Sequence, residues 1–290
     1  MKIQPVIKWT GSKRTQADYI VNLIPDEIDT YYEPFLGGGS MLIRMLEECE
    51  RGNKNVKRFV ASDLNADLIG IFKIIKKNPD QLMNDYSYRS TILRELDWDK
   101  ATEYYNSIRR TYNSLKPDDI LRPYLLFFLT RTCFNGLIRY NSNGEFNTSF
   151  HINRYGIEPY KMAKIICEWS NLLNKYDVKF ASTSYEYILP LAEENDFIYL
   201  DPPYANSSSK MYQHDIFDNL KMFDMLRECP CKYALSYDGR VEDEDNTFNV
   251  PTDIYKRHEY INARNSAFRR IVTQKTKEVN ESLYMNYEKP

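Results

Sequence analysis

Residues 196–204, DFIYLDPPY, constrain the fold of this chain more than any other stretch. The apolar run FIYL predicts a short buried strand, because aromatic and β-branched residues favour a pleated, buried surface. Pro202 and Pro203 must end that strand, since proline lacks a backbone N–H and restricts the residue before it. The chain therefore places a carboxylate, two rigid carbonyls and an aromatic ring at the C-terminal edge of a sheet, where ligands bind in open α/β folds.

This edge suits a planar ring that carries an amino group. The Asp201 carboxylate and the Pro202 carbonyl offer acceptors for the two amino protons, and Tyr204 offers a face for stacking. The structural alternative is a strand followed by a proline-stiffened turn, and for an isolated Pro-Pro dipeptide that alternative is the better one. Asp directly before the prolines and Tyr directly after them favour a binding role.

Residues 30–40, TYYEPFLGGGS, predict a strand, a glycine loop and a helix that Ser40 is placed to cap. The loop lacks Gly-Lys-Ser/Thr, so it is not a phosphate-binding P-loop, and its spacing is not that of a dinucleotide-binding G-x-G-x-x-G turn. A plain flexible loop is the alternative. Three consecutive glycines inside a well-patterned βα unit instead favour a nucleotide-binding turn of another kind.

Asp63 ends a second predicted strand, within residues 56–65, and follows Gly39 by 24 positions. An acidic residue at about this distance from a glycine loop is placed to hold the two hydroxyls of a ribose. On local sequence alone, Asp63 serves equally well as the N-cap of the next helix. Earlier in the chain, residues 10–13 (TGSK) predict an anion-favouring turn at the start of a helix from Arg14 to Ile24.

Asp201 comes 138 positions after Asp63, far more than one further βα unit needs, because loops are short and helices average about three turns. We therefore expect an insertion at 67–168 within a sheet-containing domain formed by 1–66 and 169–290. Helical patterns make the insertion mainly helical, at 67–77, 99–115 and 120–133. After Cys133 the sequence NGLIRYNSNGEFNTSF predicts a loop. Further strands are predicted at 178–185, 231–239, 254–261 and 282–287, with a solvated acidic loop at 242–245.

The insertion has a basic segment in a chain that is acidic overall. Between residues 105 and 165 nine Lys and Arg oppose four Asp and Glu, whereas the whole chain has a net charge of −2. A cluster of this size is usually a solvated face. Aromatic and Asn side chains interleaved with the cations favour a nucleic-acid surface instead, since Arg contacts phosphates and guanine while Asn reads adenine edges.

The remaining composition describes a cytoplasmic protein. Five scattered cysteines argue against a disulfide framework, and neither they nor the three histidines show metal-ligand spacing, so no metal is expected. No apolar run approaches about 18 residues and the N-terminus lacks the pattern of a signal peptide, so no membrane partner is expected.

The ordered motifs resemble those of the Dam-type (alpha-group) N6-adenine DNA methyltransferases, namely KWTGSK (8–13), EPFLGGGS (33–40), SDLN (62–65), the basic insertion and DPPY (201–204). Residues 131–147 are similar to the target-recognition segment of that family. The resemblance implies an α/β, Rossmann-like methyltransferase with a mixed seven-stranded sheet and an inserted, mainly helical target-recognition domain. It also implies that S-adenosyl-L-methionine is the methyl donor and that double-stranded DNA is the substrate, whose target base is flipped out of the duplex.

The resemblance assigns roles to individual residues of this chain. Catalytic roles fall to Asp201, Pro202, Pro203 and Tyr204. Cofactor contacts fall to Trp9, Gly11, Lys13, Glu33, Phe35, Gly37, Gly39, Asp63, Ser184, Tyr185 and Asp201. DNA contacts fall to Lys8, Phe134, Asn135, Leu137, Arg139 and Arg154.

The sequence departs from the family after Phe146-Asn147, because Ile152 stands where GATC-reading members place a guanine-binding Arg. GATC is therefore a first expectation; either Arg154 substitutes or the outer base is read differently. Rival reactions are methylation of cytosine N4, which Ser in place of Asp201 would have favoured, and of an RNA base. Cytosine C5 chemistry needs a Pro-Cys element between the glycine loop and Asp201, which is absent. A DNA-binding protein without turnover is the non-enzymatic rival, and a cognate restriction endonuclease is a conceivable partner.

Overall fold

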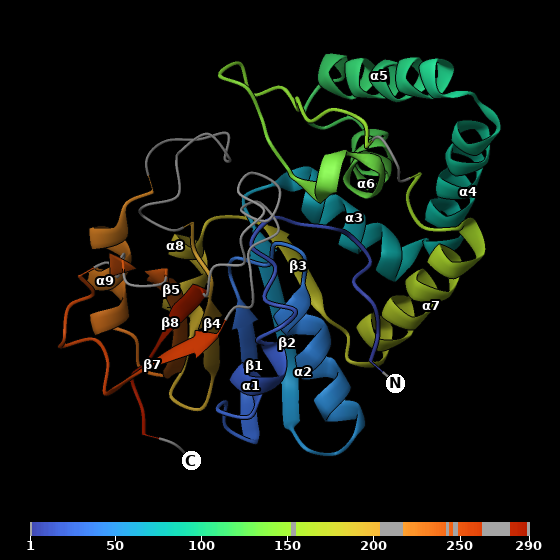
Figure 1. Ribbon diagram of the computed structural model, residues 1–290. Coiled ribbons are helices and arrows are strands. Elements are labelled where there is room, and N and C mark those ends of the chain that lie inside the picture. Colours follow the sequence, from blue (N-terminus) through green and yellow to red (C-terminus); the bar gives the residue numbers. More distant parts are fainter. Residues whose placement is uncertain are drawn as a thin grey trace.

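The fold is a mixed β-sheet with helices on both faces and a helical segment beside it (Figure 1). The computed structural model describes residues 2–151, 155–203, 217–241, 244–245, 249–262 and 279–288. Seven strands follow the order β3-β2-β1-β4-β5-β8-β7, and the two-residue β6 pairs with β5. The strands are β1 Glu27–Glu33, β2 Asn55–Asp63, β3 Lys179–Ser182, β4 Phe197–Leu200, β5 Lys232–Val241, β6 Glu244–Asp245, β7 Arg257–Asn262 and β8 Val279–Met285.

The first five strands of the sheet run parallel, and β8 is antiparallel to both β5 and β7. This arrangement confirms the predicted mixed seven-stranded sheet and adds β6 to it. The prediction of a loop at 242–245 is wrong at its C-terminal end, because Glu244 and Asp245 pair with β5.

Alternate residues of β4 enter two hydrophobic cores on opposite faces of the sheet. Phe197 and Tyr199 pack in the larger core with α2 (Ser40–Glu50) and α3 (Ala66–Lys77). Ile198 and Leu200 pack in a second core with α8 (Tyr185–Ile188) and α9 (Asn219–Arg227). All four side chains are buried. A parallel strand that is covered on both faces needs such a continuous apolar run. This requirement explains why β4 could be predicted from the sequence.

The helices are α1 Ala17–Val21, α2 Ser40–Glu50, α3 Ala66–Lys77, α4 Pro79–Glu95, α5 Trp98–Ser114, α6 Arg122–Thr132, α7 Pro159–Lys175, α8 Tyr185–Ile188 and α9 Asn219–Arg227, with short 3-10 turns η1 Phe134–Gly136 and η2 Leu189–Leu191. Helices α3 to α7 lie together on one side of the molecule (Figure 1). The sequence pattern predicted α3, α5 and α6 to within a few residues, but it did not predict α4 or α7.

The predicted boundary at 168/169 falls inside α7, a single helix. Buried side chains of α5 and α6 belong to the same hydrophobic cluster as those of α2, α3 and β1. The insertion therefore shares its core with one face of the sheet.

Three local predictions near the sheet edge are wrong for reasons of backbone geometry. The N-terminal helix begins at Ala17, three residues after the predicted start, and has five residues, so the Thr-Gly-Ser-Lys turn does not start a helix. Gly39, in the left-handed conformation, occupies the N-cap of α2, and the Ser40 hydroxyl instead contacts the Ser12 hydroxyl at 2.7 Å. Strand β3 ends at Ser182 because Ser184 turns the chain and caps α8.

Candidate active site

Three charged side chains meet at the C-terminal edge of the sheet. Asp201 directly follows β4, and its Oδ1 lies 2.7 Å from the Lys13 Nζ, which also lies 3.3 Å from Oε2 of Glu281. Lys13 is only 4% exposed. Burial on its own lowers the pKa of Lys13, but the two carboxylates outweigh burial and raise that pKa above the ordinary lysine value. The lysine is therefore an ammonium held between two carboxylates.

The topology explains why residues so far apart in sequence meet here. Parallel strands β4 and β5 end at the same edge, and β8, which is antiparallel to β5, begins there. Glu281 lies near the start of β8, whereas Lys13 comes from the segment before α1. The sequence did not predict Glu281 as a site residue. No local signal shows that an antiparallel strand begins at this edge of the sheet.

Glu33 ends β1, the strand beside β4, and its side chain is 2% exposed. Burial raises the pKa of Glu33 well above the usual value, and the negative charge of Asp201 adds to that rise. The Tyr31 hydroxyl, which donates to Glu33 Oε2 at 3.0 Å, and a backbone N–H oppose the rise without cancelling it. The neutral acid is therefore favoured at Glu33 next to the charged cluster.

Asp63 joins the end of β2 to the glycine loop. Its Oδ2 accepts from the Gly37 N–H at 3.0 Å, and its Oδ1 accepts from the Asn65 N–H at 3.0 Å. Burial raises the pKa of Asp63, and these backbone donors oppose the rise. The alternative role as a helix cap is wrong, because the Asn65 side chain caps α3 by accepting from the Leu68 N–H at 2.9 Å.

Trp9 covers the glycine loop. A Cβ on Gly37 would lie 3.2 Å from Trp9 Cδ1, and one on Gly38 would lie 3.1 Å from Trp9 Cβ. Gly37 also has a φ of +48°, a conformation that L side chains rarely adopt. The close approach of Trp9 and this backbone conformation require glycine at position 37. From the sequence, the glycines were interpreted only as a loop without side chains.

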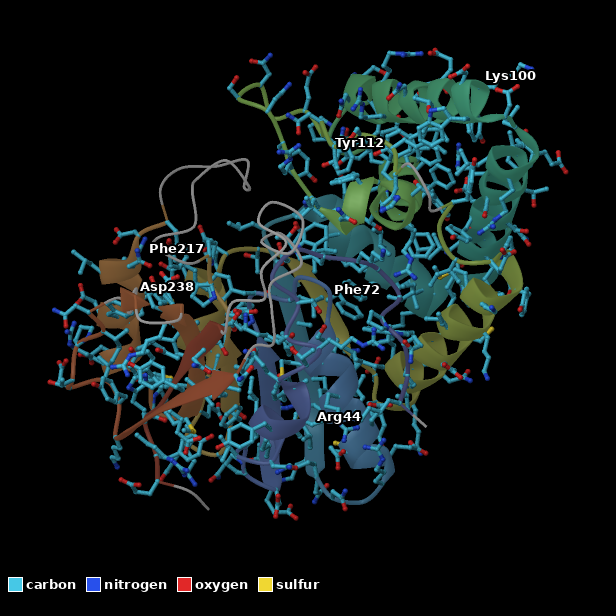
Figure 2. The ribbon with its side chains drawn as sticks, in the orientation of Figure 1. Arg44, Phe72, Lys100, Tyr112, Phe217 and Asp238 are labelled. Carbon is cyan, nitrogen blue, oxygen red and sulfur yellow. The ribbon has the colours of Figure 1, made fainter. Side chains whose placement is uncertain are left out.

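An aromatic cluster of Phe35, Tyr185 and Phe217 lies beside the loop. Phe35 stacks on Tyr185 with ring centroids 5.5 Å apart, and Phe217 contacts both rings from the segment before α9. Phe217 is labelled in Figure 2. Burial raises the pKa of Tyr185 to about 12, so its phenol stays neutral. Ser184 uses its hydroxyl to accept from the Glu186 N–H and cap α8.

The chemistry of these groups fits a nucleoside that carries a cationic amino-acid chain. The edge presents Asp63 and Asp201 as acceptors for hydroxyl and ammonium donors and as negative charge for a sulfonium, with the Glu33 carboxyl beside them, and aromatic rings that suit a flat base. Within the described ranges, no three His, Cys, Asp or Glu side chains are grouped so that they could hold a metal ion.

A hairpin-like segment from Cys133 to His151 carries most of the predicted DNA contacts. Bridges Cys133–Phe150 and Tyr140–Phe146 close it. At its start Asn135 adopts a left-handed φ of 55°, its Oδ1 lies 3.2 Å from Nε2 of His151, and Phe134 stacks on the same imidazole. The Leu137 carbonyl accepts from the Thr148 hydroxyl at 2.8 Å across the segment.

Lys8 packs against this segment from the N-terminal side, because a Cβ on Gly136 would lie 2.6 Å from Lys8 Cδ. The Ile138 N–H donates to the Thr10 hydroxyl at 3.1 Å. The hairpin is therefore fixed to the same N-terminal stretch that carries Lys13 into the charged cluster.

The predicted basic surface is smaller than the residue count suggested. Arg139 is exposed, but Arg122 forms an ion pair with Asp67 at 2.9 Å, and Arg131 is 6% exposed. Burial lowers the pKa of Arg131 to about 10. Arg131 is buried and Arg122 is half-buried and paired, so the interpretation of all nine cations as one surface is wrong.

The comparison with known proteins decides the family. The sequence profile of the D12 class N6 adenine-specific DNA methyltransferases matches residues 9–242. The chain belongs to this family. It is 30% identical to the type II methyltransferase M.MjaIII of Methanocaldococcus jannaschii, over 99% of this chain and 100% of that protein. It is 29% identical to the DNA adenine methylase of Escherichia coli K12, over 72% of this chain and 67% of that one.

Among the residues predicted to form the sites of this D12 methyltransferase, Tyr204 and Arg154 lie outside the described residues, as does Ile152. Pro202 is buried and Pro203 half-buried directly after Asp201. Gly11 has a φ of +79° in the turn before Lys13. Two residues of the edge, Glu281 and Phe217, were not predicted from the sequence. For Phe217 the reason is that an aromatic residue shortly before a helix does not by itself indicate a binding site. No described helix of the enzyme has the length and apolar character needed to cross a membrane.

Proposed function

We propose that this D12 methyltransferase transfers a methyl group from S-adenosyl-L-methionine to the N6 amino group of adenine within a short specific sequence of double-stranded DNA. The observation that carries the proposal is the Asp201 carboxylate at the end of β4, beside the buried Glu33 and the ammonium of Lys13. Acceptors of this kind at a sheet edge suit an exocyclic amino group and a cationic donor.

The bound cofactor supplies an electrophilic methyl group on a sulfonium. On the protein side, Trp9, Gly11, Lys13 and the loop from Glu33 to Gly39 hold the methionine part, and Asp63 accepts from the ribose hydroxyls. Ser184, Tyr185 and Phe35 lie against the adenine of the cofactor. The hydrogen bond that Asp63 accepts from the Gly37 N–H supports this assignment. It connects the proposed ribose-binding residue to the proposed methionine-binding loop before the cofactor binds.

The chemical difficulty lies in the amino nitrogen of adenine, whose lone pair is delocalised into the ring. Hydrogen bonds from that group to Asp201 and to the Pro202 carbonyl favour a pyramidal nitrogen with its lone pair aimed at the methyl carbon. The reaction is then a direct in-line displacement, promoted by positioning and by fixed charges. Once methylated, the amino nitrogen is a strongly acidic cation and passes one proton to the Asp201 carboxylate or to water. Asp201 therefore orients the amino group and need not act as a strong base.

The target adenine must leave the stacked duplex to reach an edge formed by Asp201, Lys13 and Glu33, because the amino group of a paired base is turned toward its partner strand. We assign Tyr204 as the aromatic face on which the flipped base stacks. Flipping costs a few kcal/mol, which contacts between the protein and the DNA backbone must offset.

Recognition of the sequence is assigned to the insertion, residues 67–168. Lys8, Phe134, Asn135, Leu137 and Arg139 are its proposed DNA contacts, with Arg139 as the base-reading side chain and Arg154 as a further cation. GATC is the first sequence to test, although Ile152 replaces a guanine-reading Arg of the family. The type II name of a relative also makes a cognate restriction endonuclease a reasonable partner.

Transfer of labelled methyl from S-adenosylmethionine to duplex DNA, followed by nucleoside analysis, tests the proposal. The unmodified protein should produce N6-methyladenine, and Asp201→Ala should lower incorporation by a factor of at least about 100, as expected for loss of a positioned acceptor. Equal incorporation by both proteins would refute the role of Asp201. N4-methylcytosine as the product would refute the assigned base.

A further inference from the structure

We propose that Asn113 of α5 is a positioning residue for sequence recognition, which holds the hairpin of residues 133–151 so that Arg139 meets the DNA in a fixed orientation. The inference rests on the proposed function, because it deepens the role assigned there to Arg139 and to the insertion. Asn113 precedes the hairpin in the chain and belongs to none of the sequence motifs.

Asn113 pairs with the backbone of the hairpin as a neighbouring strand would. Its Nδ2 donates to the Phe146 carbonyl at 3.0 Å, and its Oδ1 accepts from the Phe146 N–H at 2.9 Å. Phe146 is buried, and its ring packs edge-on against Tyr112 of α5 and Tyr140 of the hairpin. Because buried backbone polar groups need partners, loss of the Asn113 amide would remove a pair of hydrogen bonds that the hairpin requires.

The ladder of the hairpin explains why Phe146 needs a partner outside it. Two backbone hydrogen bonds flank the bridge between Tyr140 and Phe146, from the Asn141 N–H to the Glu145 carbonyl at 2.9 Å and from the Asn147 N–H to the Arg139 carbonyl at 3.0 Å. In an antiparallel ladder, the two residues between such bonds face each other without exchanging hydrogen bonds. The N–H and carbonyl of Phe146 therefore point away from the opposite strand, toward α5.

Two further side chains of α5 hold the same strand of the hairpin. The Tyr105 hydroxyl donates to the Thr148 carbonyl at 2.9 Å, and Nη1 of Arg109 donates to the same oxygen at 3.2 Å. Tyr105, Arg109 and Asn113 follow one another at a spacing of four residues, so they share one face of the helix. This face of α5 lies along the hairpin over about two helical turns (Figure 1).

The opposite strand of the hairpin carries Arg139. Its neighbours Ile138 and Tyr140 are buried, whereas Arg139 is exposed. The hydrogen bond from the Asn147 N–H to the Arg139 carbonyl joins this residue to the strand that α5 holds. A guanidinium that reads a base must reach two acceptors at once, so a shift of the held strand would misplace it.

Discrimination between duplexes tests the inference. We would measure single-turnover methylation of a GATC duplex, or of the motif that plasmid sequencing identifies, and of its singly substituted versions, for the unmodified protein, Asn113→Ala, Arg139→Ala and the double variant. Asn113→Ala should lower discrimination roughly fivefold to tenfold at the base pair where Arg139→Ala lowers it, and less elsewhere. The double variant should lose little more than Arg139→Ala alone, because the effect of Asn113 passes through Arg139.

Asn106→Ala is the matched control. Asn106 is a half-buried residue of the same helix, and no hydrogen bond joins its side chain to hairpin residues 133–151, all of which the structure describes. The substitution changes helix propensity in the same way as Asn113→Ala and should leave discrimination unchanged. Tyr105→Phe removes one hydroxyl while Arg109 still donates to the Thr148 carbonyl, so it should relax the same base pair by less than Asn113→Ala does.

Calorimetry of S-adenosylmethionine binding checks that the variants keep the fold. The Kd of Asn113→Ala should stay within about twofold of that of the unmodified protein, because a tenfold change would correspond to about 1.4 kcal/mol and the hairpin does not form the proposed cofactor site. A larger loss of cofactor binding would overturn the inference, since it would indicate a general effect on stability.

The remaining outcomes separate this inference from the proposed function. If the unmodified protein methylates no DNA, the proposed function fails. If it discriminates between duplexes and Asn113→Ala keeps the same base preferences, the role of Asn113 is refuted. A uniform loss on all duplexes, additive losses in the double variant, or unchanged preferences in Arg139→Ala would refute it as well, because none of these results passes through the orientation of Arg139.

Discussion

Glu33 and Lys13 show how burial acts on single residues at this edge. Both side chains are almost fully buried, at 2% and 4% exposure. Lys13 has two carboxylate partners that keep it charged, whereas Glu33 has the Tyr31 hydroxyl, and burial raises its pKa well above the usual value. The same environment therefore favours an ammonium at one position and a neutral acid at the other.

The raised pKa of Glu33 predicts a stability that depends on pH. The neutral acid is favoured in the fold, so the contribution of Glu33 is fully present below the unfolded pKa of about 4.3 and is lost as pH rises through the higher folded value. Glu33→Gln, which cannot ionise, should match the unmodified protein near about pH 4 and have a higher Tm near about pH 8. Calorimetric melts without cofactor across this range test the prediction; a Tm advantage of the unmodified protein that grows with pH would contradict it.

The role of Arg139 also follows from its exposure, because Arg131 is buried and Arg122 is half-buried in an ion pair with Asp67. Arg139→Ala should relax discrimination at one base pair of the recognition sequence by about 1–3 kcal/mol, the usual worth of a bidentate base contact. Methylation rates on a set of singly substituted duplexes measure this loss. A uniform decrease on all duplexes would instead indicate a phosphate contact.

At the scale of elements, the connection from β1 to α2 depends on Gly39. The residue has a φ of +67°, and a Cβ there would lie 3.0 Å from Trp169 and 3.2 Å from Phe72. Trp169 belongs to α7 and Phe72 to α3, so the glycine loop packs directly against the inserted helices.

Gly39→Ala should therefore lower the free energy of unfolding by more than the left-handed backbone alone requires, which is about 1–2 kcal/mol. Gly52→Ala is the matched control, since Gly52 has a φ of +75° with no atom within 4 Å of its Cβ position. Urea unfolding compares the two variants. Equal losses would mean that the contacts with Trp169 and Phe72 contribute nothing.

A largely buried ion pair joins α3 to α6 within the insertion. Arg122 of α6 contacts Asp67 of α3 at 2.9 Å, and the Tyr112 hydroxyl of α5 donates to the same carboxylate at 2.7 Å. Tyr112 lies among the inserted helices, far from Asp238 of the sheet (Figure 2). One carboxylate thus connects three helices.

Asp67→Ala should cost about 1–3 kcal/mol, because it leaves the half-buried Arg122 guanidinium without its carboxylate and the Tyr112 hydroxyl without its acceptor. The Tm should fall by about 2–4 °C for each kcal/mol lost. Glu103→Ala, which breaks the exposed pair between Glu103 and Arg110, should change stability by less than about 1 kcal/mol. Similar Tm values for the two variants would contradict a structural role for Asp67.

At the scale of the whole molecule, the sequence predicted elements whose signals lie in adjacent or regularly spaced residues. It did not predict contacts between residues that only the tertiary fold brings together. Strand β4 and the Asp201-Pro-Pro turn were predictable from the sequence. A parallel strand buried on both faces and the prolines that end it are encoded in adjacent residues. Helix α4 was missed because only four of its 17 residues are buried, which gives a weak hydrophobic pattern.

The candidate site was predictable only where its residues lie in motifs. Asp63 was identified by its distance from the glycine loop, but the choice between a ribose contact and a helix cap needed the geometry of Asn65. Glu281 reaches the edge through an antiparallel strand, and Arg122 leaves the surface through a pair with Asp67. Such partnerships depend on tertiary contacts that local sequence does not encode.

Under the proposed function, this sheet edge directs a methyl group to adenine N6 in one short DNA sequence. Methylation of a plasmid by the purified protein, followed by single-molecule sequencing, reads the modified base and its context together. We expect N6-methyladenine confined to a single short motif. Modification of cytosine, or N6-methyladenine scattered without a shared sequence, would contradict it.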